Sequence, residues 1–156
     1  MRSDDATWVF GDRFLLATDY GPRTKRERVS MFEISVDYTF AAGHALRGYK
    51  GKCENVHGHN YKVRVIVAGD ELNNIGLLMD FVDLRASIKA MVEKWDHRFL
   101  NDLPPFDKLN PSAENMAKVF SDGIEADVSK HGLRVSSITV WETDTTSATY
   151  RPPSGS

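Results

Sequence analysis

Three histidines lie close together in the chain and could hold a metal ion. His57 and His59 are two residues apart, and His44 comes thirteen residues before His57. In an extended chain, residues two apart point to the same side, and His44 could return from the neighbouring strand of a hairpin. Neutral imidazoles are usual ligands of catalytic zinc, and three protein ligands leave a fourth position for substrate. All-imidazole ligation therefore favours zinc, although other divalent metals accept the same donors.

Two residues that could move a proton, Cys53 and Glu54, lie in the same stretch. A thiolate beside a metal and Lys52 would have a lowered pKa and could act as a base or a nucleophile. Cys53 could instead be a fourth zinc ligand, which would make the site closed and structural. The spacing alone leaves both interpretations open, and Glu54 could be an ordinary loop residue.

Other candidates lie further along the chain. Asp96 and His97 follow an apolar helical pattern, so His97 could complement the helix dipole or could be an acid/base group tuned by the carboxylate. Glu142 interrupts an apolar strand. It could face solvent, or it could bind an amino-amidine edge with both oxygens. Glu114 could simply stabilise a helix N-terminus.

Composition narrows the class of protein. A chain of 156 residues favours one domain with a real core. The formal net charge of -2 argues against nucleic acid as the main partner. A single cysteine excludes an intrachain disulfide and fits a reducing, cytoplasmic location. No apolar run approaches the roughly 18 residues of a membrane span, so no membrane partner is expected.

Apolar periodicity predicts six elements in the order ββααββ, an α+β fold. Strands are expected from Phe32 to Phe40 and through Tyr61 to Val67, with a loop from Ala41 to Lys52. One helix is expected from Asp80, as N-cap, to Trp95, and another from Asn110, as N-cap, and Pro111 to His131-Gly132. The inward stripe of the first helix is Phe81, Leu84, Ile88, Met91, Val92 and Trp95. Two closing strands are expected at Ser137 to Thr143 and at Ala148 to Arg151.

The domain is expected to span residues 31–151, followed by a polar tail at 152–156. Residues 1–30 are interpreted as a disordered leader or as the product of an upstream start codon, with Met31 as the functional start. The alternative is an extension that packs on a partner subunit through Trp8, Phe10 and Phe14.

Six short motifs follow one another between residues 32 and 151. They are Phe40-Ala41-Ala42-Gly43-His44, Cys53-x-x-x-His57-Gly58-His59, Gly76-Leu77-Leu78-Met79-Asp80-Phe81, Asp96-His97-Arg98-Phe99-Leu100-Asn101, Asn110-Pro111-Ser112-Ala113-Glu114-Asn115, and the late Glu142. In these motifs and their order the chain resembles the 6-pyruvoyl-tetrahydropterin and 6-carboxy-tetrahydropterin synthase family.

The resemblance implies a T-fold, a four-stranded antiparallel sheet with two helices on one face. It also implies trimers whose sheets join into a barrel, two trimers stacked as a hexamer, and sites between subunits. By this resemblance, His44, His57 and His59 would bind zinc, and Cys53 would be the general base. Asp96 and His97 would form a partnered acid/base pair. Glu142 would anchor the pterin, with Glu114 supporting that pocket.

The implied substrate is 7,8-dihydroneopterin triphosphate. The spacing Cys53-x-x-x-His57 resembles the bacterial branch that forms 6-carboxy-5,6,7,8-tetrahydropterin, triphosphate and acetaldehyde for queuosine synthesis. Glu54-x-x-His57 also resembles a branch in which glutamate is the base and the product is 6-hydroxymethyl-7,8-dihydropterin for folate synthesis. A pyruvoyl-forming enzyme and a catalytically silent zinc- or pterin-binding paralogue are the remaining alternatives.

Overall fold

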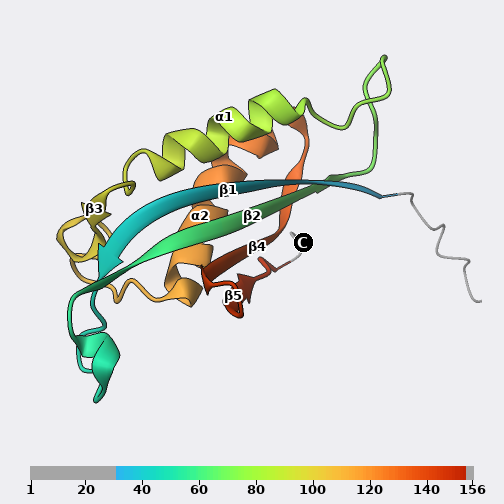
Figure 1. Cartoon of the computed structure of the whole chain (residues 1–156). Helices are drawn as coiled ribbons and strands as arrows, with labels where there is room; N and C mark the ends of the chain where they lie inside the picture. Colours follow the sequence, from blue (N-terminus) through green and yellow to red (C-terminus); the bar gives the residue numbers. More distant parts are fainter. Residues whose placement is uncertain (1–30, 154–156) are drawn as a thin grey trace, which may run out of the picture.

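The computed structural model describes residues 31–153, in which two α-helices cover one face of a five-stranded sheet (Figure 1). The expected α+β class is confirmed. The predicted leader at 1–30 lies outside the described residues. The strands are β1 (Phe32–His44), β2 (His57–Gly69), β3 (Arg98–Phe99), β4 (Arg134–Thr143) and β5 (Thr146–Tyr150), and the helices are α1 (Phe81–Val92) and α2 (Ala113–Val128).

Strands β1 and β2 form a long antiparallel hairpin that runs from the Phe32–Gly69 pair to the His44–His57 pair. The predicted loop from Ala41 is wrong at its start, because the alternation of buried side chains continues through Ala42 and His44. This alternation fixes the register, since a slip of one residue would turn every buried side chain to the other face.

The sheet has the order β3-β1-β2-β4-β5, so the prediction of four antiparallel strands is wrong by one strand. The additional strand, β3, has two residues and runs parallel to β1 beside Ala42 and Gly43. Two residues are too few to produce a period in the sequence. Strands β4 and β5 also begin earlier than predicted, at Arg134 and Thr146.

The start of α1 agrees with the prediction, and the start of α2 does not. The Asp80 carboxylate accepts a hydrogen bond from the Val82 N–H, which confirms Asp80 as an N-cap. For α2 the predicted cap at Asn110 is wrong. Ser112 is the N-cap, and its hydroxyl accepts from the Asn115 N–H.

The inward stripe of α1 is confirmed for Leu84, Ile88 and Val92, which are buried, but is wrong for Phe81, which is 55% exposed. The buried face of α2 packs against β4 and β5. Neither helix in the described part of the chain has the length and apolar character that a membrane crossing requires.

An aromatic layer fills the core beneath the end of the sheet that carries the histidines. The ring of Phe40 stacks on Tyr61 with centroids 5.1 Å apart. Trp95 packs edge-on against Phe120 and Phe106, with centroids 4.7 and 5.0 Å away. These rings support β1 and β2 immediately before His44 and after His59, so the core holds the two strands that present the histidines.

Candidate metal centre and active site

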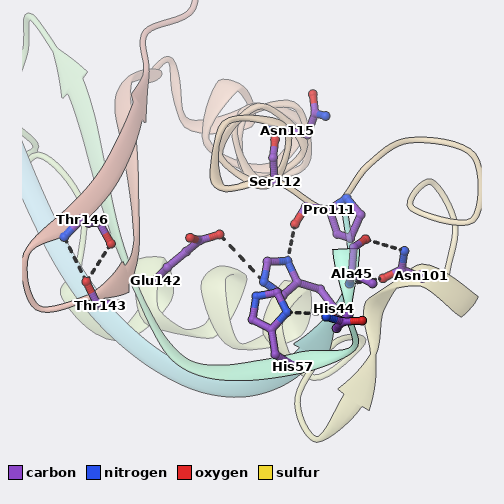
Figure 2. A network of polar contacts seen from close by, with 11 residues as sticks. His44, Ala45, His57, Asn101, Pro111, Ser112, Asn115, Glu142, Thr143 and Thr146 are labelled. Carbon is purple, nitrogen blue, oxygen red and sulfur yellow. Dashed lines mark hydrogen bonds and ion pairs between the residues drawn. The ribbon is translucent and has the colours of Figure 1, made fainter. Parts of the chain in front are cut away.

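His44, His57 and His59 converge at one end of the β1–β2 hairpin, as the parity of the residues predicts. Figure 2 shows the rings of His44 and His57 side by side. One ligand atom from each ring lies within 4.8 Å of the others. The ring centroids of His44 and His57 are 4.4 Å apart, and those of His57 and His59 are 5.0 Å apart. His44 is buried, whereas His57 and His59 are half-buried.

Backbone carbonyls hold two of these rings by the nitrogen that faces away from the centre. His44 Nδ1 lies 2.7 Å from the Pro111 carbonyl oxygen, and His57 Nδ1 lies 2.8 Å from that of Asn55. A carbonyl can only accept, so both rings are assigned the tautomer with hydrogen on Nδ1 and a lone pair on Nε2.

The other nitrogens fit a metal. The Nε2 atoms of His44 and His59 are buried and have no hydrogen-bond partner among residues 31–153. Burial lowers the pKa of His44, against smaller opposing effects of the Pro111 hydrogen bond and Glu142, so the neutral form that a metal requires is favoured. Buried polar atoms without a partner are costly, and a divalent cation would be bound by the lone pairs of these nitrogens.

Glu142 points from β4 toward the centre (Figure 2), with its Oε1 atom 4.0 Å from His44 Nε2. It lines a hollow of about 250 Å³ with Glu114, Ser112 and Ala113 at the start of α2, and with residues of β5. Glu142 is therefore oriented into a pocket rather than toward open solvent, and Glu114 lies at the same pocket.

Cys53 lies in a short 3-10 helix, Lys52–Glu54, within the loop that joins β1 to β2. It is half-buried, and its carbonyl accepts a hydrogen bond of 2.9 Å from the Leu46 N–H. The group of ligand atoms within 4.8 Å contains the three imidazoles and not the Cys53 thiol, among the residues described. This geometry argues against Cys53 as a fourth ligand.

Asp96 and His97 dock onto β1 at Ala41. The Asp96 carboxylate accepts from the Ala41 N–H at 2.9 Å, and the His97 N–H donates to the Ala41 carbonyl at 2.6 Å. His97 has a φ of 55°, which is uncommon for a residue other than glycine. Its Nε2 atom lies 3.8 Å from Asp96 Oδ1, and its side chain is 83% exposed. The pair is close but not hydrogen-bonded.

His97 lines a different hollow, of about 540 Å³, with Ala41, Gly43, Gly58 and Asn60. These four have the opposite strand parity to His44 and His59, although His59 reaches this hollow too. A Cβ atom on Gly58 would lie 3.2 Å from the Ala42 carbonyl oxygen, so glycine keeps the two strands close. Within one chain, His97 and Glu142 are thus in separate hollows.

Sequence reasoning missed Tyr61, whose ring meets those of His44 and His59 edge-on at 5.7 and 5.4 Å. Its hydroxyl is buried without a partner among the described residues. The signal was available, because Tyr61 shares the parity of His57 and His59 on one strand. The sequence also gave no role to Asn101 and only that of a helix cap to Asn110, although both stand in motifs.

Comparisons with known proteins match these features. A sequence model of the family described as 6-pyruvoyl tetrahydropterin synthase matches residues 33–153. A 6-carboxy-5,6,7,8-tetrahydropterin synthase of Haemophilus influenzae is 32% identical over 143 residues, which cover 78% of this chain and 99% of the relative. The protein of the same name from Bacillus subtilis is 35% identical over 131 residues, covering 80% and 88%.

Among solved structures, the chain is similar to 6-pyruvoyl tetrahydropterin synthase of Caenorhabditis elegans. The TM-score is 0.72 at 25% identity, and the match covers 80% of this chain and 98% of the other. The Plasmodium falciparum protein of that name gives a TM-score of 0.63 at 22% identity and shares the fold. Residues 33–153 thus carry the whole fold of these relatives.

Proposed function

The chain belongs to the 6-pyruvoyl tetrahydropterin synthase family, and we propose that it is a zinc-dependent lyase that forms 6-carboxy-5,6,7,8-tetrahydropterin. Its substrates would be 7,8-dihydroneopterin triphosphate and water, and its other products acetaldehyde and triphosphate. The observation that carries this proposal is the convergence of three imidazoles beside Glu142, with Nε2 of His44 4.0 Å from the carboxylate.

His44, His57 and His59 would hold the metal through the nitrogens that face one another. Zn²⁺ bound there would supply a Lewis acid that polarises substrate oxygens and acidifies the neighbouring positions. Since the Pro111 and Asn55 carbonyls orient two of the rings, the chain presents preformed ligands and loses little side-chain freedom on binding.

The substrate would lie between Glu142 and Cys53. The Glu142 carboxylate can accept two hydrogen bonds from the amino-pyrimidinone edge of a pterin, much as carboxylates bind arginine. Glu114, at the same hollow, would support that pocket. The Cys53 thiolate would remove a proton from the substrate side chain, and the electron pair left behind would flow into the pterin ring.

Asp96 and His97 would exchange a hydroxyl proton of the substrate, with the carboxylate orienting the imidazole. His97 lies in a different hollow from Glu142, which supports a site shared between copies of the chain. Within residues 31–153, β3 and β5 are the outer strands of the sheet, and neighbouring copies can pair at such edges, which supports the same arrangement. We propose trimers joined in this way, two of which stack as a hexamer.

The names of similar proteins favour the carboxy product, and the burial of Cys53 relative to Glu54 argues against the hydroxymethyl product. Relatives named 6-carboxy-5,6,7,8-tetrahydropterin synthase share 30 to 36% identity over roughly 80% of the chain. Cys53 is half-buried whereas Glu54 is exposed, so the thiol has the drier environment that a general base uses. The product would then enter queuosine synthesis.

Mass spectrometry of the products from 7,8-dihydroneopterin triphosphate tests this proposal. We expect the carboxy product and triphosphate. The hydroxymethyl product as the main species would overturn the branch, and absence of triphosphate release would refute the enzyme and leave a silent binding protein. Glu54→Gln should leave the product ratio unchanged if Cys53 is the base.

Subunit mixing tests the shared site. His97→Ala and Glu142→Gln should each be inactive as pure oligomers. When the two proteins are dissociated and reassembled together, some sites combine an intact His97 from one copy with an intact Glu142 from another, so activity should return. Continued inactivity of well-formed mixed oligomers would place both residues in the site of a single copy.

A further inference from the structure

Two asparagine side chains hold the backbone immediately after the metal-ligand candidate His44. Asn101 accepts from the Ala45 N–H at 2.9 Å and donates to the Ala45 carbonyl at 2.8 Å. Asn110 does the same for Arg47, with both distances at 2.9 Å. Each amide satisfies both backbone groups of one residue, as a paired residue on an adjacent strand would. The contact between Asn101 and Ala45 is visible in Figure 2.

The residue between these two anchors reaches Cys53. The Leu46 N–H donates to the Cys53 carbonyl at 2.9 Å. Three consecutive residues are therefore held, two by asparagine amides and the middle one by the loop that carries the thiol. Leu46 also lines the hollow of Glu142.

The same segment holds the His44 ring. Pro111, next to Asn110, provides the carbonyl for His44 Nδ1 at 2.7 Å. The Asn110 carbonyl accepts in turn from the Asn115 side chain on α2 at 2.9 Å. The Arg47 guanidinium adds hydrogen bonds to the carbonyls of Asn101, Phe106 and Leu109. Hydrogen bonds thus connect the His44 ring, the backbone that follows it and the start of α2.

We infer that Asn101 and Asn110 are positioning residues that fix His44 and the Cys53 loop relative to each other. This inference rests on the proposed function only for the roles of His44 and Cys53. Neither asparagine lines the hollows of Glu142 or His97, so neither has a place from which to touch substrate there. Their effect would pass through the backbone of residues 44–47.

These hydrogen bonds require an amide, because the side chains of Asn101 and Asn110 each donate one bond and accept another. Aspartate has nearly the same shape but only acceptors, so it would set a carboxylate oxygen against the Ala45 or Arg47 carbonyl. The bonds of Asn101 are partly buried and those of Asn110 are exposed. Water can replace a lost bond more easily at Asn110, so Asn101→Asp should have the larger effect.

Asn73→Asp is a matched control at the opposite end of the sheet. The Asn73 Oδ1 atom accepts from the Ile75 and Leu77 N–H groups at 3.1 and 2.9 Å. Aspartate keeps both bonds, because only an acceptor is used. The control thus introduces the same charge into a loop without breaking its hydrogen bonds.

The experiment compares the full-length chain with Asn101→Asp, Asn110→Asp and Asn73→Asp in two measurements. The first is zinc affinity by chelator competition. The second is the rate at which dithionitrobenzoate modifies Cys53 in metal-free protein, a clear signal because the chain has one cysteine. We expect about tenfold to about 100-fold weaker zinc binding in the first two variants, the range for partners that orient metal ligands. We also expect a several-fold change in their thiol rate, and no change in either measurement for Asn73→Asp.

Unchanged zinc affinity and an unchanged thiol rate in Asn101→Asp and Asn110→Asp would overturn the inference. If Asn101→Asp fails to fold, Asn110→Asp decides, since its bonds lie at the surface. If the unaltered chain binds no zinc, the proposed metal centre fails, and the thiol rates still decide whether the asparagines fix the Cys53 loop.

Discussion

Tyr61→Phe removes one oxygen atom from beneath the three histidines and leaves the ring in place. Tyr61 has no exposed surface, and its ring stacks on Phe40 at 5.1 Å with the planes 19° apart. Its hydroxyl has no hydrogen-bond partner in the described part of the chain. Phenylalanine keeps the stacking and the edge-on contacts with His44 and His59, so the substitution isolates the hydroxyl.

The sign of the effect follows from this geometry. A buried polar group without a partner costs about 1–3 kcal/mol, and phenylalanine relieves that cost. The small space left by the oxygen offsets part of the gain. We expect the free energy of unfolding of metal-free Tyr61→Phe to rise by about 1 kcal/mol. For a chain of 156 residues this corresponds to a Tm higher by about 2–4 °C.

Urea and thermal unfolding of metal-free protein measure this difference. Tyr38→Phe is the control, because Tyr38 lies on the same face of β1 as Phe40 but is only half-buried. Burial, with a smaller contribution from Glu142, raises the pKa of Tyr61, so its phenol stays neutral. The gain should therefore be independent of pH from about 6 to about 9. A loss of more than about 1 kcal/mol would refute the reasoning, because it would require a hydrogen-bond partner for the hydroxyl.

Three other substitutions have definite expected outcomes. Cys53→Ala should lower the rate of product formation by about 100-fold or more while zinc remains stoichiometric by elemental analysis; loss of zinc would identify the thiol as a ligand. Leu84→Ala should cost about 2–5 kcal/mol in urea unfolding because Leu84 is fully buried, whereas Val82→Ala, 70% exposed, should cost little. The hydrogen bond from Arg64 lowers the pKa of the Asp37 carboxyl. Asp37→Asn should therefore reduce stability slightly above about pH 4, in a salt-sensitive way, and the difference should vanish as pH falls through the lowered pKa; a difference that persists in acid would contradict this.

Strand parity made the convergence of the three histidines predictable from the sequence. Residues two apart on β2 share a face, so His57 and His59 had to lie beside Tyr61 and Val63. Once β1 is paired antiparallel to β2, the buried faces of both strands must coincide, and His44 then stands opposite His57. The apolar alternation of both strands carries this information over many residues, which is why the three rings lie together as expected.

The start of α2 could not be predicted, because it depends on contacts distant in sequence. Asparagine before proline is a reasonable N-cap, but the Asn110 amide is engaged with Arg47, 63 residues away. The cap therefore falls to Ser112. Local propensity describes what a side chain can do, and here a tertiary hydrogen bond decides which of two local options is used.

Adjacency in sequence also gave an incomplete account of Asp96 and His97. The two residues are neighbours, yet the carboxylate bonds to the Ala41 N–H, and the left-handed φ of His97 turns its imidazole outward, where it is 83% exposed. His97 lines the hollow beside Ala41 and Gly43, whereas Glu142 lines the hollow at the start of α2, and the two hollows share no lining residue. A catalytic role for His97 together with Glu142 then requires a second copy of the chain, and the return of activity in mixed oligomers is the measurement that distinguishes this from two unrelated hollows.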